Sequence, residues 1–284
     1  AQPTRDIELM HGVVERDGPL ALVLAATSFA QTAPDCQEGV DWVARIVCAK
    51  GIGAVNPKQP QAAARPGAIR SAQMTALRNA VELVKGVSIN SSTTVANAMT
   101  SDDMVRSKVE AYVKGFQFGQ PHYMDDLTVE MFVKLPLDGV GEIVLPSSIQ
   151  ATPSVTSWGS AAAAPGVSRS TVYTGLVVDA RGLGIIPALA PRVMDSENKE
   201  IYGGALVSRE WAVKYGMAGY AKSVEGARGL KDRVGENPAV VKAVRADGAA
   251  KTDVVLSPED ASSLRSATQN LKFLSEARVV FVVD

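Results

Sequence analysis

The chain has 284 residues, which is enough to bury a substantial core in one or two domains, and we favour two. Its formal net charge is −1, and Lys and Arg are spread along the sequence. This distribution argues against a basic stripe for nucleic acid and against a polybasic membrane patch. Aromatic residues make up 5% of the chain, which is more typical of a scaffold of sheets and helices than of an aromatic-lined platform for sugars or bases.

Residues 1–30 are interpreted as an upstream segment followed by a signal peptide. The apolar run LALVLAATSFA at residues 20–30 ends with Ser28 and Ala30 at the small-residue positions that signal peptidase favours. As a helix this run would be about 17 Å long, against a hydrocarbon core of about 30 Å, so we expect export and no transmembrane anchor. An ordinary buried helix or strand is the alternative, because acids precede the run where a signal peptide should be basic.

Cys36 and Cys48 are the only cysteines of the chain. In an exported protein an oxidising compartment would allow a disulfide, which would close a loop of about a dozen residues and stabilise the fold by roughly 2 to 3 kcal/mol. The alternative is an unpaired, buried Cys48 on a strand over residues 43–49. The only histidines are His11 and His122, so the thiols fall short of a closed zinc site and we predict no metal ion.

An amphipathic helix is predicted over residues 65–86, where apolar residues recur three or four positions apart. The predicted buried stripe consists of Ile69, Gln73, Leu77, Val81 and Val84, widened by Met74 and Ala80. Gly86 would end this helix. β-Branched residues interleaved with Ser and Asn over residues 87–95 then predict a strand with one face in water.

A second helix is predicted to begin after Ser101, a candidate N-cap that precedes two acidic residues, and to end near Gly115. Alternating apolar and polar residues, with Leu127 on the apolar side, then predict two strands joined by a turn around residues 124–126. Residues 31–138 are therefore expected to form one α+β domain of helices and an antiparallel sheet.

The order of these elements, together with GIGAVNP at residues 51–57 and AIRSAQMTALRNAVELVKGVSINSSTTV at residues 68–95, resembles the LPP-twenty lipoprotein family of bacterial envelopes. The same domain type opens the flagellar H-ring assembly protein T. The resemblance covers about residues 42–137 and implies an α+β fold, a place in the cell envelope and no catalytic residue. Lipoproteins of this family carry an acylated Cys after small residues. Cys36 follows Pro-Asp instead, so we expect no lipid anchor there.

Residues 139–170 read as a linker, because scattered glycines and prolines are followed by GSAAAAPGVSRS. A short strand over residues 142–145 is an alternative for its beginning. Trp158 in this linker could be an exposed contact for a partner protein, whereas Trp42 and Trp211 are expected to pack in cores.

Residues 171–284 are predicted to form a second, α/β domain. The chain is therefore expected to be an α+β protein of two small domains, each a mainly antiparallel or mixed sheet packed by helices. Strands are predicted at residues 172–179, 189–194, 240–246, 253–256 and 277–284, and helices at residues 208–215 and 258–270. Ser208 and Ser257 would cap the two helices, and the final strand, a continuous apolar run, should lie inside the sheet.

Two motifs that suggest chemistry have simpler structural explanations. Tyr123-Met124-Asp125-Asp126 spells a reverse-transcriptase signature, but a two-metal polymerase needs a further carboxylate and a basic template channel, so we favour a hairpin turn. The glycines within residues 50–56 and 180–184 lack the third glycine or the following helix of a dinucleotide loop. We interpret the first as a turn and the second as an extended loop.

No catalytic set is recognisable in the sequence. GxSxG, SxxK and HExxH patterns are all missing, and His122, at a strand end, reads as an exposed or edge histidine. Acids that meet only in space leave no local mark, so Asp179 and Asp195 are the first carboxylates to inspect for hydrolysis.

These observations predict an exported, non-catalytic envelope protein without a cofactor, periplasmic or associated with the outer membrane. Its partners would be envelope proteins or further copies of itself, and by analogy with the resembled family the contacts could belong to an outer-membrane or flagellar basal assembly. A periplasmic module that binds a small ligand or peptidoglycan in a cleft between the domains is the alternative. An enzyme would instead show clustered carboxylates with strongly perturbed titration.

Overall fold

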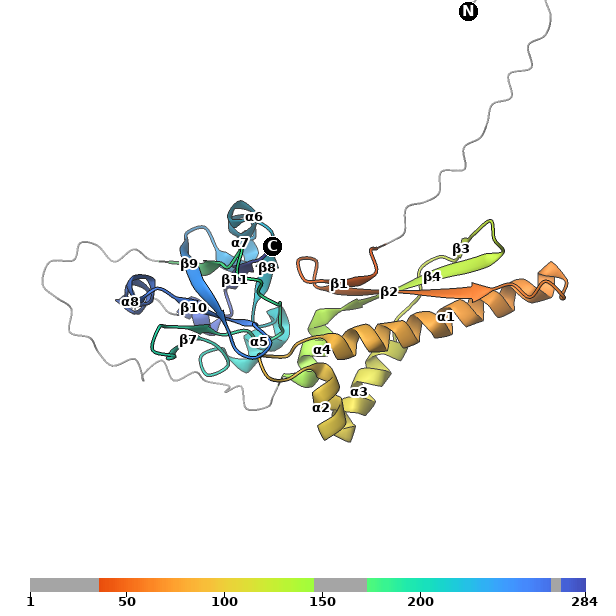
Figure 1. Cartoon of the computed structure of the whole chain (residues 1–284), viewed down its shortest axis with the longest axis horizontal. Helices are drawn as coiled ribbons and strands as arrows, with labels where there is room; N and C mark the ends of the chain where they lie inside the picture. The colour runs from red at the N-terminus through yellow and green to blue at the C-terminus, as the bar shows by residue number, and fades with distance from the viewer. Residues whose placement is uncertain (1–35, 146–172, 267–271) are drawn as a thin grey trace, which may run out of the picture. The chain divides into compact units, whose positions relative to one another are not determined.

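The computed structural model describes residues 36–145, 173–266 and 272–284, which belong to one compact unit over residues 34–284 (Figure 1). They form an α+β fold with two sheets, one of four antiparallel strands and one of seven strands in mixed directions. The predicted fold class is thereby confirmed. The predicted signal peptide lies outside the described residues.

The four-stranded sheet contains β1 (Gly39–Asp41), β2 (Ile46–Ala54), β3 (His122–Tyr123) and β4 (Thr128–Pro136), in the order β1-β2-β4-β3. β2 and β4 pair along their whole lengths. The predicted hairpin around residues 124–126 is confirmed, because β3 and β4 flank it as an antiparallel pair. The interpretation of residues 50–56 as a turn is wrong for its first five residues, which continue β2.

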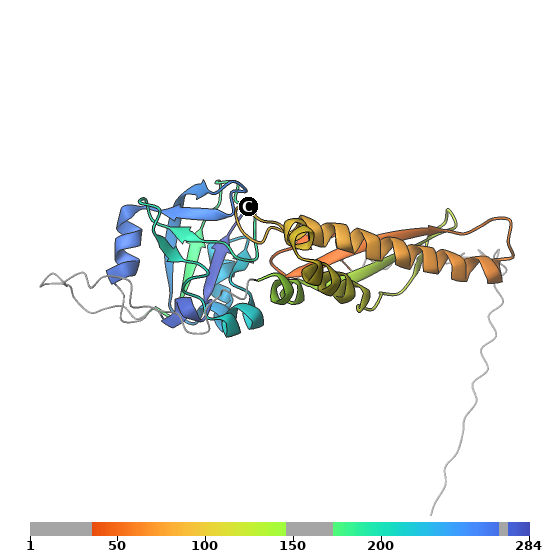
Figure 2. The same ribbon diagram turned by 90° about the horizontal axis from the view of Figure 1, so that it is seen from below.

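α1 (Gln61–Gly86) is the predicted long helix, and it runs along β2 and β4 (Figure 2). Ala80 and Val84 are buried as predicted, but the rest of the buried stripe differs, since Met74 is 58% exposed and small residues face the sheet. The stripe consists of Ala64, Ala68, Ala72, Ala76, Ala80 and Val84. The cause is the close approach of α1 to β2. A Cβ atom at Gly51 would lie 2.0 Å from the carbonyl oxygen of Ala72, so neither element has room for larger side chains.

Three shorter helices complete this part of the chain: α2 (Val95–Ser101), α3 (Asp103–Lys114) and α4 (Leu137–Val144). The strand predicted over residues 87–95 is wrong, because only isolated bridges form there and Thr94 caps α2 by accepting the N–H of Asn97. The predicted N-cap of the next helix is also wrong. Asp102, and not Ser101, accepts the first free N–H groups of α3, and Ser101 ends α2 instead.

α4 lies where the linker, or a short strand, was expected to begin. Leu137, Val140 and Val144 are buried at helical spacing, which explains why this segment packs as a helix. Residues 146–172, which hold the rest of the predicted linker, lie outside the described residues.

The seven-stranded sheet has the order β7-β6-β10-β9-β5-β11-β8. Its strands are β5 (Gly175–Asp179), β6 (Val193–Met194), β7 (Glu200–Tyr202), β8 (Gly219–Ala221), β9 (Pro238–Asp247), β10 (Asp253–Leu256) and β11 (Val279–Val282). β5 pairs in parallel with β9 and β11, whereas β9 and β10 are antiparallel. The final strand, β11, is fully buried and lies inside the sheet between β5 and β8, as predicted.

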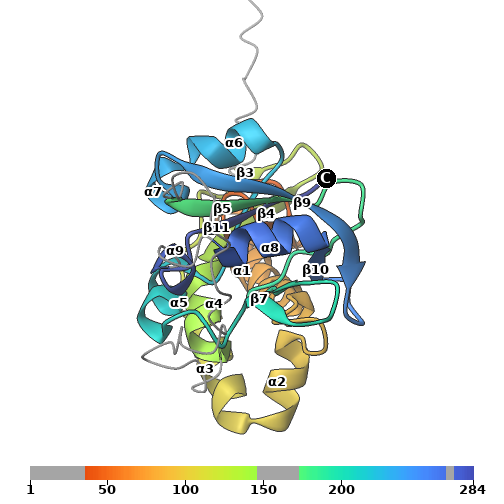
Figure 3. The same ribbon diagram turned by 90° about the vertical axis from the view of Figure 1, so that its left-hand side faces the viewer.

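The helices of this second part are α5 (Arg209–Tyr215), α6 (Val224–Gly229), α7 (Lys231–Val234), α8 (Pro258–Ser266) and α9 (Lys272–Ser275). α6 and α7 contact β5 and β11, and all four are labelled in Figure 3. The predicted cap of α8 is confirmed, because the hydroxyl of Ser257 accepts the N–H of Asp260 at 3.1 Å. Ser208 precedes α5 as predicted, but its side chain makes no capping hydrogen bond.

The loop after α1 bonds to the second part of the chain within the compact unit. The carbonyls of Ser88 and Ile89 accept the N–H groups of Leu189 and Ala190 at 2.9 and 2.7 Å. One large hydrophobic core includes residues from both sheets. Every helix in the described ranges is too short or too polar to cross a membrane.

Candidate interaction surface

Large apolar side chains are exposed together at the end of the β3–β4 hairpin. Tyr123, Met124 and Leu127 are 55%, 40% and 54% exposed. Together with Val55, which follows β2, and Arg65 on α1, they line a small hollow. We call these five residues the hairpin tip. Contiguous exposed apolar surface is characteristic of contact sites, whereas single exposed apolar residues are common everywhere.

Backbone hydrogen bonds hold the hairpin tip in one conformation. The N–H of Leu127 donates to the carbonyl of Met124 at 3.3 Å, and the N–H of Val55 donates to the carbonyl of Leu127 at 3.0 Å. The guanidinium carbon of Arg65 lies 5.4 Å from the ring centre of Tyr123 in a cation–π contact. Leu127 has a φ of +64°, in the left-handed region that is costly for a residue with a side chain. The tip therefore presents an exposed leucine on a rigid and strained turn.

The polymerase-like motif Tyr123–Asp126 forms this turn. The carboxylate of Asp126 accepts the N–H of Thr128 at 3.0 Å and its hydroxyl at 2.6 Å, which is the hydrogen bonding of an Asx turn. The hydroxyl bond is the main reason that the pKa of Asp126 lies below its usual value. In the ranges that the structure describes, no three metal-ligating side chains cluster. Asp126 thus has a structural role in the turn.

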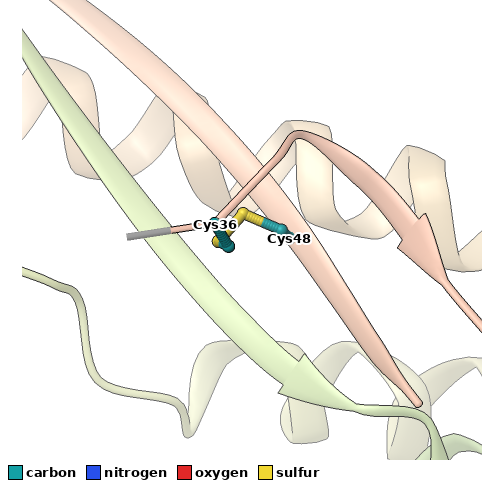
Figure 4. Close-up of a disulfide and its surroundings, with 2 residues drawn as sticks. All are labelled: Cys36 and Cys48. Carbon is teal, nitrogen blue, oxygen red and sulfur yellow. A yellow bond between two sulfur atoms is a disulfide. The ribbon is translucent and has the colours of Figure 1, made fainter. Parts of the chain in front are cut away.

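Cys36 and Cys48 are joined by a disulfide, with their Cα atoms 6.1 Å apart (Figure 4). Cys48 lies on β2 and is 1% exposed. Because side chains alternate along a strand and Gly51 faces α1, the side chain of Cys48 lies on the opposite face of the sheet. We call this the open face, since α1 covers the other one. The disulfide anchors the chain that precedes β1 to the open face.

His122 also lies on the open face. Its ring stands edge-on to Phe132, with the ring centres 5.9 Å apart. Its buried Nε2 atom makes no hydrogen bond with any part of the chain that the structure describes. The position is the strand end that the sequence predicted, and the contact is one of packing.

The two carboxylates singled out for hydrolysis are both held by arginines. Asp179 accepts hydrogen bonds of 2.8 and 2.7 Å from Arg181, and these lower its pKa. Asp195 accepts a hydrogen bond from Arg265 and two from backbone N–H groups of the following turn. Burial raises the pKa of Asp195, but these donors outweigh burial and hold the pKa below its usual value. Both groups are therefore ionised at neutral pH, which suits a general acid poorly.

Sequence reasoning missed an ion pair between the buried Asp253, at the start of β10, and the partly exposed Arg192. Asp253 is 0% exposed and accepts the backbone N–H of Arg192 at 3.0 Å and its guanidinium at 3.0 and 2.6 Å. These bonds raise the pKa of Arg192, whose guanidinium also lies 3.3 Å from the hydroxyl of Ser91. The two partners are 61 residues apart, so no local pattern could have connected them.

The structure describes two of the three tryptophans. Trp158 lies outside the described residues, so its contact with a partner stays a prediction. Trp42 stands edge-on to Tyr220 at 5.4 Å, and Trp211 stacks on Tyr215 at 5.1 Å. Both are partly buried against the large core, as predicted.

The part of the chain that forms the seven-stranded sheet is similar to a domain of a known protein. Residues 175–284 match the family model described as the second domain of Treponema pallidum Tp0624. The match begins at the first residue of β5 and includes every strand of that sheet, but it covers less than half of the chain. The chain is therefore similar to that domain over this sheet. No curated protein matches the chain.

Proposed function

We propose that the chain is an exported bacterial envelope protein that acts through contacts with other proteins and not through catalysis. The hairpin tip carries this proposal, because Tyr123, Met124 and Leu127 stay exposed on a turn that hydrogen bonds hold rigid. A preordered apolar surface loses little conformational freedom when a partner covers it, and this favours binding.

The disulfide between Cys36 and Cys48 supports export. Disulfides persist in oxidising compartments such as the periplasm and are rare in the cytosol. The resemblance of residues 42–137 to the LPP-twenty family points to the same compartment. The proposal therefore includes a periplasmic or outer-membrane-associated location, with contacts that belong, by analogy alone, to an outer-membrane or flagellar basal assembly.

Site-specific photocrosslinking in cells tests the proposal. A benzophenone amino acid replaces Tyr123 at the hairpin tip or, as the control, Val244, which is 55% exposed on β9. The proposal expects defined crosslinked envelope proteins from position 123 and far less product from position 244. Equal capture from both positions, or recovery of the uncrosslinked chain alone from the soluble periplasm, would contradict it.

A second variant separates lost binding from lost folding. Leu127→Gly removes the exposed leucine and also relieves its positive φ, so it should not destabilise the fold. Crosslinking from position 123 should nevertheless fall in this variant. If purified protein hydrolysed a broad substrate panel and point changes abolished that activity, the non-catalytic role would be wrong.

A further inference from the structure

β2 has a free edge beyond β1. β1 pairs with β2 only at Ile46–Cys48, whereas β4 pairs with the other side of β2 along all of its length. In the described ranges, no strand pairs with Ala49–Ala54 on the β1 side. An unpaired strand edge is a template on which another extended chain can pair.

The ladder with β4 shows which residues of β2 direct their backbone groups to this edge. The N–H of Val55 donates to the carbonyl of Leu127, and the N–H of Leu137 donates to the carbonyl of Arg45. Both bonds continue the β2–β4 register, so the odd-numbered residues of β2 bond to β4. In an antiparallel ladder the alternate residues direct their N–H and C=O groups to the other side.

Lys50, Ile52 and Ala54 therefore direct their backbone groups to the free edge. The carbonyl of Lys50 is already occupied there, because the side-chain amide of Asn79 on α1 donates to it at 2.8 Å. As far as the described residues go, the N–H groups of all three residues and the carbonyls of Ile52 and Ala54 remain for a further strand. The side chains of the same three residues lie on the open face, where Ile52 is 47% exposed.

The disulfide keeps residues 36–38 from continuing β1 along this edge. Gly39 stands opposite Cys48, so a longer β1 would place Gln37 opposite Lys50. Cys36 is instead bonded to Cys48 on the open face (Figure 4). Gly39 has a φ of +130°, which favours glycine, at the point where the chain leaves the ladder.

Two copies of this chain do not fit together through antiparallel pairing of their β2 edges. α1 lies directly against β2, since a Cβ at Gly53 would come within 2.0 Å of the carbonyl oxygen of Ala68. Antiparallel pairing of two β2 edges would put both α1 helices on the same face, over strands about 4.8 Å apart. Packed helices need about 8 to 10 Å between their axes, so the two helices would collide. A strand that brings no helix meets no such obstacle.

We propose that this edge binds an extended segment of a partner protein, which adds a strand antiparallel to β2. The residue opposite Ile52 should be β-branched and apolar, because it packs beside the exposed isoleucine. Lys50 Nζ lies 3.4 Å from Glu130, a long ion pair that leaves the ammonium able to bind a second carboxylate. The segment should therefore carry an acid two residues after its apolar residue. This inference rests on the proposed function and defines the partner's chemistry.

Amide hydrogen exchange on the full oxidised chain is the first test. In the free protein the N–H groups of Ile52 and Ala54 should exchange quickly, whereas those of Gly51 and Gly53, bonded to β4, should be protected. The probe is the blocked peptide acetyl-TTTVTD-amide, with acetyl-TTTVTK-amide as the charge control. At millimolar concentration the acidic peptide should protect Ile52 and Ala54, leave Gly51 unchanged and bind more tightly than the control.

Variants of Ile52 separate backbone pairing from side-chain contact. Ile52→Pro deletes the outward N–H without touching the bonds to β4, and should weaken binding of the acidic peptide roughly tenfold or more. Ile52→Thr keeps the N–H and the β-branch and should bind within a few fold of wild type. Strong protection of Ile52 in the free protein, failure of the acidic peptide to bind, or wild-type binding by Ile52→Pro would each overturn the inference.

Crosslinking from the hairpin tip distinguishes failure of the edge inference from failure of the proposed function. If Ile52→Pro captures the same envelope proteins through position 123 as wild type, the edge inference fails and the proposed function stands. If position 123 captures no envelope protein while the acidic peptide still protects Ile52, the binding edge stands and the envelope role fails.

Discussion

Gly51→Ala should destabilise the protein by about 2 kcal/mol. A Cβ at residue 51 would lie 2.0 Å from the carbonyl oxygen of Ala72 and 2.2 Å from the nitrogen of Ala76. Both are backbone atoms of α1, so neither can rotate away and the helix must shift from the sheet. Overpacking a core costs about 1 to 3 kcal/mol, and a rigid obstacle favours the upper end. Alanine regains about 0.5 to 1 kcal/mol over glycine within a strand, which leaves the net loss.

Urea unfolding followed by far-ultraviolet circular dichroism measures this loss, and the thermal midpoint should fall by roughly 4 to 8 °C. Gly67→Ala on α1 is the matched control, because an added Cβ there would point into open space. It should stabilise the protein by up to about 1 kcal/mol, through helix propensity alone. If Gly51→Ala were as stable as wild type while Gly67→Ala gained stability, α1 would not lie this close to β2. The steric argument against antiparallel pairing of two β2 edges would then fail as well.

Three further substitutions, with Lys199→Gln as a control, test the disulfide and the ion pairs. Cys48→Ser should cost about 3 kcal/mol, because the bond closes a loop over a sequence separation of 12, and reductant should then lower the stability of wild type but not of the variant. Asp195 has a pKa below its usual 3.8 in the fold, so the stability it contributes is complete above pH 4 and lost as pH falls through that lower pKa. Asp195→Asn should therefore be less stable at pH 7 and show a flatter loss of stability on acidification, and an unchanged acid profile would contradict this role. Asp253→Asn should cost about 1 to 3 kcal/mol, a loss that is limited because Arg192 is 41% exposed and can turn to water. Lys199→Gln, in an exposed ion pair, should cost less than about 1 kcal/mol. Similar losses for these last two variants in urea unfolding would refute the importance of burial.

The elements predicted correctly have local signals. Residues 258–266 form a helix because Ser257, Pro258 and an acid at the third helical position all favour its start. A strand was wrongly predicted over residues 87–95, because β-branched residues alternate there as in a strand. The side chain of Asn90 accepts the N–H groups of Ser92 and Thr93 and closes a turn instead.

The buried stripe of α1 could not be read from the helix alone. Leu77 and Val81 are the larger residues, but the glycines of β2 bring the strand so close that only alanines fit between the two backbones. The hairpin tip shows the same limit. Alternation places Leu127 with the buried Val129 and Met131, yet the left-handed conformation of Leu127 turns it into solvent. A free strand edge cannot be predicted from the sequence alone, because its presence depends on where the neighbouring strand ends.

The close packing of α1 on β2 also restricts what can lie beside β2. A helix that lies over a strand next to the edge leaves no space for another helix over the adjoining strand. β1 satisfies this restriction because it is only three residues long and joins β2 through a turn in which Asp41 accepts the N–H groups of Val43 and Ala44. On the open face, the bonded Cys36 occupies the surface next to the Lys50 end of the edge. A partner strand is therefore limited by α1 on one face and by Cys36 on the other. Selection among extended segments must then depend mainly on the residues opposite Ile52 and Lys50, and this is why those two positions define the peptide probe.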